Sequence, residues 1–155
     1  MSAPGTILVG YDGSSDSEAA VHWAARLSVA TGKRLRIVHA VGLLEHAGLG
    51  SRTTPHREAA VRVATAAGAL LADVEWSVVV GDPCSALLRI TDAPDSTVQL
   101  VVVGSRGSSA HGGSLLGSTS LEVAEHSSVP VTVVPADYAS VAAYRRRESG
   151  RAGQN

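Results

Sequence analysis

The chain has 155 residues, of which 45% are hydrophobic, 17% are charged and only 3% are aromatic. This length suits one domain with a sizeable core, and the formal net charge of -1 gives no reason to expect DNA, RNA or an anionic membrane as a partner. Cys84 is the only cysteine, which excludes an internal disulfide, and no apolar run approaches the length of a membrane span. Residues 1–5 lack the basic and apolar regions of a secretory signal, so we expect a cytoplasmic protein.

Five short apolar runs, rich in Val, Leu and Ile, are typical of buried β-strands. They lie at residues 6–10, 35–41, 74–80, 98–103 and 131–134. Between them, apolar residues recur at helical spacing. This predicts a helix that begins at a cap on Ser15 or Asp16 and ends before Gly32. Further helices are predicted over residues 56–71, 83–91 (with Asp82 as N-cap and Pro83 in the first position) and 117–126.

The alternation of strands and helices predicts an α/β fold, an open five-stranded parallel sheet with helices on both faces. Residues 1–135 form one Rossmann-like domain in this interpretation, and residues 136–155 form a polar tail that we expect to be disordered. Ligands of such folds bind at the carboxyl ends of the strands, beside the point where the strand order reverses. Small polar residues follow the first strand at 12–13 and the fourth at 104–107, so we expect these two strands to be neighbours.

The segment 104–118 contains the candidate phosphate site. Gly107 permits the positive φ that turns successive N–H groups toward an anion, and Gly117 and Ser118 open a helix whose first amides lack partners. The helix dipole and the hydroxyls of Ser118 and Thr119 also favour phosphate. Because the single lysine of the chain lies outside this segment, backbone amides must provide most of the hydrogen bonds to phosphate. The residues assigned to phosphate are Gly104, Ser105, Arg106, Gly107, Gly117, Ser118 and Thr119.

The spacing G-x2-G-x9-G-[S/T] within residues 104–118 resembles the nucleotide loop of the universal stress protein family. Residues 7–14, which read Ile-Leu-Val-Gly-Tyr-Asp-Gly-Ser, also resemble that family. So do residues 101–107 and the last strand at 129–134, and the resemblance covers roughly residues 5–135. It implies a homodimer and the binding of ATP with Mg²⁺.

By the same resemblance, Asp12 holds the ribose or the adenine edge, the backbone of Val41 meets the adenine, and Gly10 leaves room for the nucleoside. An aspartate after a strand also commonly forms a turn or a helix cap. The exposed apolar edge of residues 131–134 offers the dimer contact, because such edges tend to be paired or covered. The leading hypothesis is an ATP-binding stress-response protein that acts as a binding or signalling module.

No residue near the loop is typical of a general base, so no catalytic residue is assigned. Slow ATP hydrolysis or self-phosphorylation at Ser114 or Ser118 stays open. The main alternative is a dimeric scaffold that works through protein contacts without a nucleotide. A less favoured alternative is an ATP pyrophosphatase, whose S-G-G-x-D-S loop is partly matched by residues 12–17. There Asp12 replaces the first serine, and its carboxylate would repel pyrophosphate.

Three other features of the sequence bear on function. The six histidines lack paired spacing, either with each other or with cysteine, so no metal site is expected. Cys84 falls in a first helical turn, where a redox role is conceivable but plain packing is the favoured interpretation. The run Arg145–Arg147 is expected to be solvated, with an acidic partner or nucleic acid as the alternative.

Overall fold

The computed structural model describes residues 4–42, 53–107 and 116–138. Five parallel strands form one sheet in the order β3-β2-β1-β4-β5. Their bounds are β1 (Thr6–Gly10), β2 (Arg34–Val41), β3 (Val74–Val80), β4 (Val98–Gly104) and β5 (Val131–Val134). The first and fourth strands are neighbours, as expected, and the strand order reverses between them.

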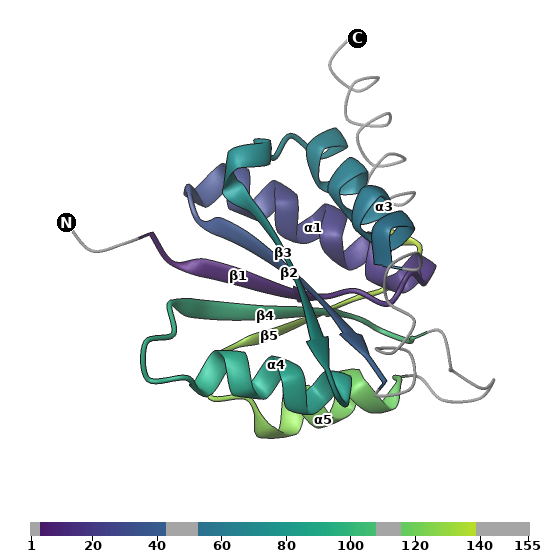
Figure 1. Cartoon of the computed structure of the whole chain (residues 1–155), viewed down its shortest axis with the longest axis vertical. Helices are drawn as coiled ribbons and strands as arrows, with labels where there is room; N and C mark the ends of the chain where they lie inside the picture. The colour runs from purple at the N-terminus through teal and green to yellow at the C-terminus, as the bar shows by residue number, and fades with distance from the viewer. Residues whose placement is uncertain (1–3, 43–52, 108–115, 139–155) are drawn as a thin grey trace, which may run out of the picture.

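Helices cover both faces of the sheet (Figure 1). On one face lie α1 (Ser15–Thr31) and α3 (Thr53–Ala66), and on the other lie α4 (Pro83–Asp92) and α5 (Ser118–His126). A short 3-10 turn, η1 (Leu71–Asp73), leads into β3. The predicted α/β fold is therefore confirmed. Among the described helices, none combines the length and the apolar character that crossing a membrane would need.

The core has two layers because successive strand residues point to opposite faces of the sheet. Ile7 and Val9 of β1 belong to the apolar cluster beneath α1 and α3, whereas Leu8 belongs to the cluster beneath α4 and α5. Helix α1 contributes small buried residues, among them Ala20 and Ala24, which let it lie close to the sheet. The long helix is thereby held close to the ends of β1 and β4.

The predicted N-cap of α1 is wrong, because the cap is Ser14. Its Oγ accepts a hydrogen bond from the N–H of Ser17 at 3.2 Å, while Asp16 is turned inward to other partners. The helix ends at Gly32, which takes the left-handed conformation as expected of a C-terminal glycine. Asp82 caps α4, also as expected, by accepting from the N–H of Ser85 at 2.9 Å.

The predicted helix over residues 56–71 is displaced, since α3 covers Thr53–Ala66. Gly68 has a φ of 102°, which takes the chain out of the helix. The following apolar residues prolong the helical pattern in the sequence, yet Leu70 and Leu71 are exposed. Ser114, Arg145–Arg147 and most of the proposed tail lie outside the described residues.

Candidate functional site

The end of β4 and the start of α5 are joined directly at the carboxyl edge of the sheet. The N–H of Gly117 donates to the carbonyl of Ser105 at 2.7 Å. The single hydroxyl proton of Ser120 is shared between that oxygen, at 3.1 Å, and the carbonyl oxygen of Gly117, at 2.9 Å. A Cβ on Gly117 would lie 3.4 Å from the backbone nitrogen of Gly107. Gly107 and Gly117, which both belong to the glycine pattern, therefore lie close together in space.

Asp16 ties the first turn of α1 to the end of β4. Its Oδ2 accepts the hydroxyl of Ser105 and, at 2.9 Å, the backbone N–H of Arg106. Both side chains in the Asp16–Ser105 contact are buried, each residue being 9% exposed. A Cβ on Gly104 would lie 2.6 Å from the carbonyl carbon of Asp16, so this close approach requires glycine. The hydroxyl of Ser105 and the N–H of Arg106, both predicted to bind phosphate, are thus already bonded within the protein. The exposed side chain of Arg106 stays available to a phosphate.

Asp12 follows β1, and its side chain approaches Gly107, which follows β4. Its Oδ1 accepts the N–H of Ser14 at 3.0 Å, which is the turn-forming role of such an aspartate. A Cβ on Gly107 would lie 2.9 Å from the Oδ2 of Asp12. The expected positive φ at Gly107 is wrong, because the described glycines with positive φ are at positions 13, 32, 68 and 81. A side chain at 107 would displace the Asp12 carboxylate, so glycine here keeps that carboxylate in place and does not serve a left-handed backbone.

The start of α5 completes this region. Gly117 is the N-cap, with φ -72° and ψ 160°, and no side chain caps the helix. The amides of Ser118 and Thr119 belong to the first turn, where the helix offers N–H groups and a favourable dipole to an anion. Ser118 is exposed and Thr119 is half-buried. The sequence did not single out Ser120, whose hydroxyl fixes the helix start to Ser105.

The two remaining predicted residues end the neighbouring strands β1 and β2. Val41 ends β2, and its carbonyl accepts the N–H of Gly81 at 2.9 Å, which leaves one lone pair on that oxygen. Gly10 ends β1, and a Cβ there would lie 3.2 Å from the Cδ1 of Leu87 on α4. Leu87 therefore fills the space that the missing side chain of Gly10 leaves on that face.

An aromatic cluster that the sequence did not reveal supports the end of β1 from the α3 side. The Nδ1 of His39 lies 2.8 Å from the carbonyl oxygen of Tyr11, and the His39 ring lies 4.8 Å from that of His56. Trp76 stacks on His39 at 5.8 Å. A Cβ on Gly13 would lie 2.5 Å from the Cε1 of His56. These rings fix the backbone beside Asp12. Burial raises the pKa of Tyr11 above its usual value, with further contributions from nearby carboxylates.

Cys84 lies buried in the apolar cluster beneath α4 and α5, which agrees with the packing interpretation. Burial raises the pKa of its thiol, and the carboxylates of Glu122 and Asp82 raise it further. These three side chains bring possible metal ligands within 4.8 Å of one another, a grouping that the histidine spacing did not predict. The two carboxylates disfavour the thiolate that redox chemistry would need.

We predict that Asp16→Ala lowers the free energy of unfolding by about 2 kcal/mol or more, because hydrogen bonds to a charged acceptor contribute about 1.5–3 kcal/mol each. Urea denaturation measures this loss. Glu18→Ala is the matched control, since Glu18 is exposed in the same first turn and the variant loses the same charge. Equal losses in both variants would show that the effect is one of helix charge alone.

We predict that Cys84 in the folded protein resists a thiol probe at neutral pH and reacts only as the pH rises or the chain unfolds. The folded-state pKa is raised, so the stabilisation linked to this thiol is complete below its unfolded pKa. It is lost as the pH rises through the folded value. Labelling followed by mass spectrometry, in native buffer and in denaturant, measures both states. Rapid labelling of the native protein at neutral pH would contradict the packing interpretation.

The model of the Universal stress protein family matches residues 4–135 of the chain. Universal stress protein Rv1636 of Mycobacterium tuberculosis is 32% identical over 149 residues, which cover 86% of this chain and 98% of that protein. Universal stress protein Rv1996 of the same species is 32% identical over 154 residues, covering 83% of this chain and 47% of that protein. This chain therefore spans about half the length of the longer curated relatives that it matches.

Solved structures share the architecture. A universal stress protein in complex with cAMP has a TM-score of 0.69 and 35% identity, and the match covers 87% of this chain and 99% of that one. UspA from Lactobacillus plantarum has a TM-score of 0.68 at 20% identity, covering 86% and 99%, which shows the common fold. Together with the family match over residues 4–135, these likenesses show that the chain belongs to the universal stress protein family.

Proposed function

We propose that the chain is a cytoplasmic stress-response protein that binds ATP with Mg²⁺ and acts as a nucleotide-dependent binding or signalling module. One observation carries this proposal. The uncapped start of α5 lies against Gly107, and Gly107 lies against the carboxylate of Asp12, at the point where the strand order reverses. A nucleotide at this edge would meet helix amides on one side and a carboxylate on the other.

In this proposal the phosphates lie at the start of α5. The N–H groups and hydroxyls of Ser118 and Thr119 bind phosphate oxygens, and the exposed guanidinium of Arg106 balances their charge. Gly107 and Gly117 keep the floor of the site free of side chains. Gly104 and Ser105 act indirectly, since both are held against Asp16 and fix the end of β4.

The nucleoside lies toward β1 and β2. Asp12, whose carboxylate lies against Gly107, accepts hydrogen bonds from ribose hydroxyls or from the adenine edge. The backbone of Val41 meets the base through the carbonyl lone pair that Gly81 leaves unused. Gly10 acts indirectly, because its lack of a side chain lets Leu87 pack against the end of β1.

The proposed role is to hold the nucleotide. The nearby carboxylates already accept protein hydrogen bonds, Asp12 from Ser14 and Asp16 from Ser105, so we assign neither as a general base. Slow hydrolysis or self-phosphorylation at the exposed Ser118 is compatible with this geometry. A second candidate ligand is cAMP, since a solved relative with 35% identity is in complex with it. Its single phosphate would engage fewer of the α5 amides than a triphosphate does.

We predict that Gly117→Ala weakens ATP binding about tenfold or more, a loss equivalent to about 1.4 kcal/mol. The added Cβ would lie 3.3 Å from the Cα of Arg106, so the start of α5 and the backbone after β4 must separate slightly, which disturbs the amides that face the phosphates. Calorimetric titration of Mg²⁺-ATP and of cAMP into each protein measures the change and ranks the two ligands.

The control for Gly117→Ala is Gly32→Ala. Gly32 lies at the far end of α1 with a φ of 68° and no atom within 4 Å of an added Cβ, so alanine there costs about 1 kcal/mol of stability without touching the site. It should bind ATP as the parent does. Parent-like binding by Gly117→Ala would overturn the loop assignment, and the absence of any binding heat in the parent would favour the scaffold alternative.

We further propose a homodimer in which β5 pairs with β5 of a second copy. This strand is an edge of the sheet and only half-buried at three of its four residues. Because the carbonyls of Pro130 and Val134 accept hydrogen bonds from β4 and its following residue, the ladder directs the backbone of Val131 and Val133 outward. Those outward groups are available to a partner strand.

We predict that Val133→Pro converts the dimer into a monomer, because proline removes the outward N–H while leaving the bonds to β4 in place. Light scattering at micromolar protein gives the mass. Val133→Thr, which keeps the N–H and the branched shape, should remain dimeric. A monomeric parent at the same concentration would exclude this assembly.

A further inference from the structure

A polar groove with a volume of about 430 Å³ lies between β2, β3 and α4. It opens at the amino edge of the sheet, where Thr6, Arg34 and Val98 begin their strands, and so at the end opposite the glycine-rich site. Cavities of this size are typical of small-molecule sites. The polar residues that line it are Thr6, Arg34, Arg36, Glu75, Arg89 and Thr97, with Asp95 and Ser96 beside them.

The charge of the groove is set by arginine. Three guanidinium groups line it, against the carboxylates of Glu75 and Asp95. The side chain of Arg36 is only 32% exposed, although it projects from the second of five strands. Its Nε lies 3.2 Å from the hydroxyl of Ser77 and 3.4 Å from the Oε1 of Glu75. These two contacts hold the guanidinium by one nitrogen.

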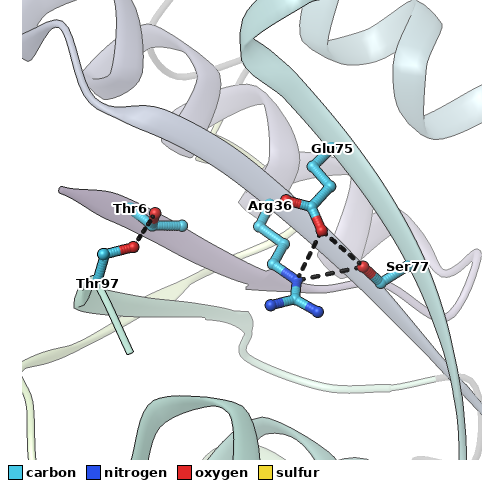
Figure 2. A network of polar contacts seen from close by, with 5 residues as sticks. All are labelled: Thr6, Arg36, Glu75, Ser77 and Thr97. Atoms are coloured by element: carbon cyan, nitrogen blue, oxygen red, sulfur yellow. Dashed lines mark hydrogen bonds and ion pairs between the residues drawn. The ribbon is translucent and has the colours of Figure 1, made fainter. Parts of the chain in front are cut away.

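Figure 2 shows the two terminal nitrogens of Arg36 pointing away from Glu75 and Ser77. Arg36 lines the same groove as Ala86 and Ile90 of α4, so these nitrogens face the cavity between the strand and the helix. Within the part of the chain that the structure describes, neither of them has a hydrogen-bond partner. A fixed, planar pair of N–H donors in a partly desolvated groove is suited to an oxyanion.

A hydroxyl pair lies on the same groove. The Oγ1 atoms of Thr6 and Thr97 are 2.8 Å apart, and one donates to the other (Figure 2). Each hydroxyl carries one proton, so the accepting threonine keeps its own proton for a further acceptor. Thr6 is buried, and its backbone N–H donates to the carbonyl of Thr97 at 2.9 Å, which fixes the pair in place. The groove thus adds a neutral donor to its guanidinium groups.

We propose that this groove is a second ligand site, which binds a small organic anion through a phosphate or carboxylate group held by Arg36. Arg34 and Arg89 provide the surrounding positive charge, and the hydroxyl of Thr6 or Thr97 supplies a further donor. The ion pair with Glu75 orients Arg36 and competes with the ligand for it. Since Glu75 is 62% exposed, this pair contributes little stability by itself and does not explain why an arginine occupies the sheet face.

Two-dimensional amide NMR tests the proposal, with inorganic phosphate and succinate as separate probes and sodium chloride as the ionic-strength control. Both probes should shift the resonances of Thr6, Arg36 and Thr97 at millimolar concentration, and the stronger probe identifies the preferred oxyanion. Arg36→Gln should weaken binding about tenfold or more, as expected when one charge-assisted pair is lost. Glu75→Gln should tighten it, because the competing carboxylate becomes neutral.

Arg26→Gln is the matched control, because Arg26 is exposed on α1 at the other face and the variant loses the same charge. It should bind both probes as the parent does. Should Arg36→Gln fail to fold, Arg89→Gln takes its place with the same expectation of weaker binding. Shifts that follow chloride equally, or equal losses in Arg26→Gln and Arg36→Gln, would overturn the site.

Discussion

A single carboxylate oxygen, the Oδ2 of Asp16, accepts two hydrogen bonds from the end of β4, one from the hydroxyl of Ser105 and one from the amide of Arg106. The position of Ser105 in turn fixes α5, because its carbonyl takes the N–H of Gly117 and the hydroxyl of Ser120. The elements α1, β4 and α5 are thus linked through the adjacent residues Ser105 and Arg106. The contact is buried, so an unpaired carboxylate there would be costly.

The two edges of the sheet are built from different chemistry. At the carboxyl edge, glycines allow backbone and carboxylate groups to approach closely, as Gly104 does for Asp16 and Gly107 for Asp12. Backbone amides and a helix dipole are the groups that this edge offers to an anion. At the amino edge, Arg36 instead presents a guanidinium that a neighbouring carboxylate holds in place. A protein with both features could respond to two anionic ligands that bind at opposite ends of one sheet.

Local patterns predicted the strands closely, because short continuous runs of Val, Leu and Ile are typical of buried parallel strands. The polar residues at the strand ends correctly predicted that β1 lies beside β4. Predictions failed where a residue serves a distant partner. Ser15 or Asp16 was expected to cap α1, yet the carboxylate of Asp16 contacts a residue 89 positions away, and no local signal encodes that contact. Gly107 was expected to supply a positive φ, but its φ is not positive, and the absent side chain instead leaves room for the carboxylate of Asp12. Likewise, only packing reveals that Leu87 fills the space beside Gly10.

The central claim is that a nucleotide binds where the end of β1, the end of β4 and the start of α5 meet. Backbone amide NMR of the isotope-labelled protein, recorded during titration with Mg²⁺-ATP, tests it most directly. The proposed site predicts that the largest shifts fall on Asp12, Gly107 and Ser118. Shifts concentrated at the amino edge, or no shifts at millimolar ATP, would contradict it.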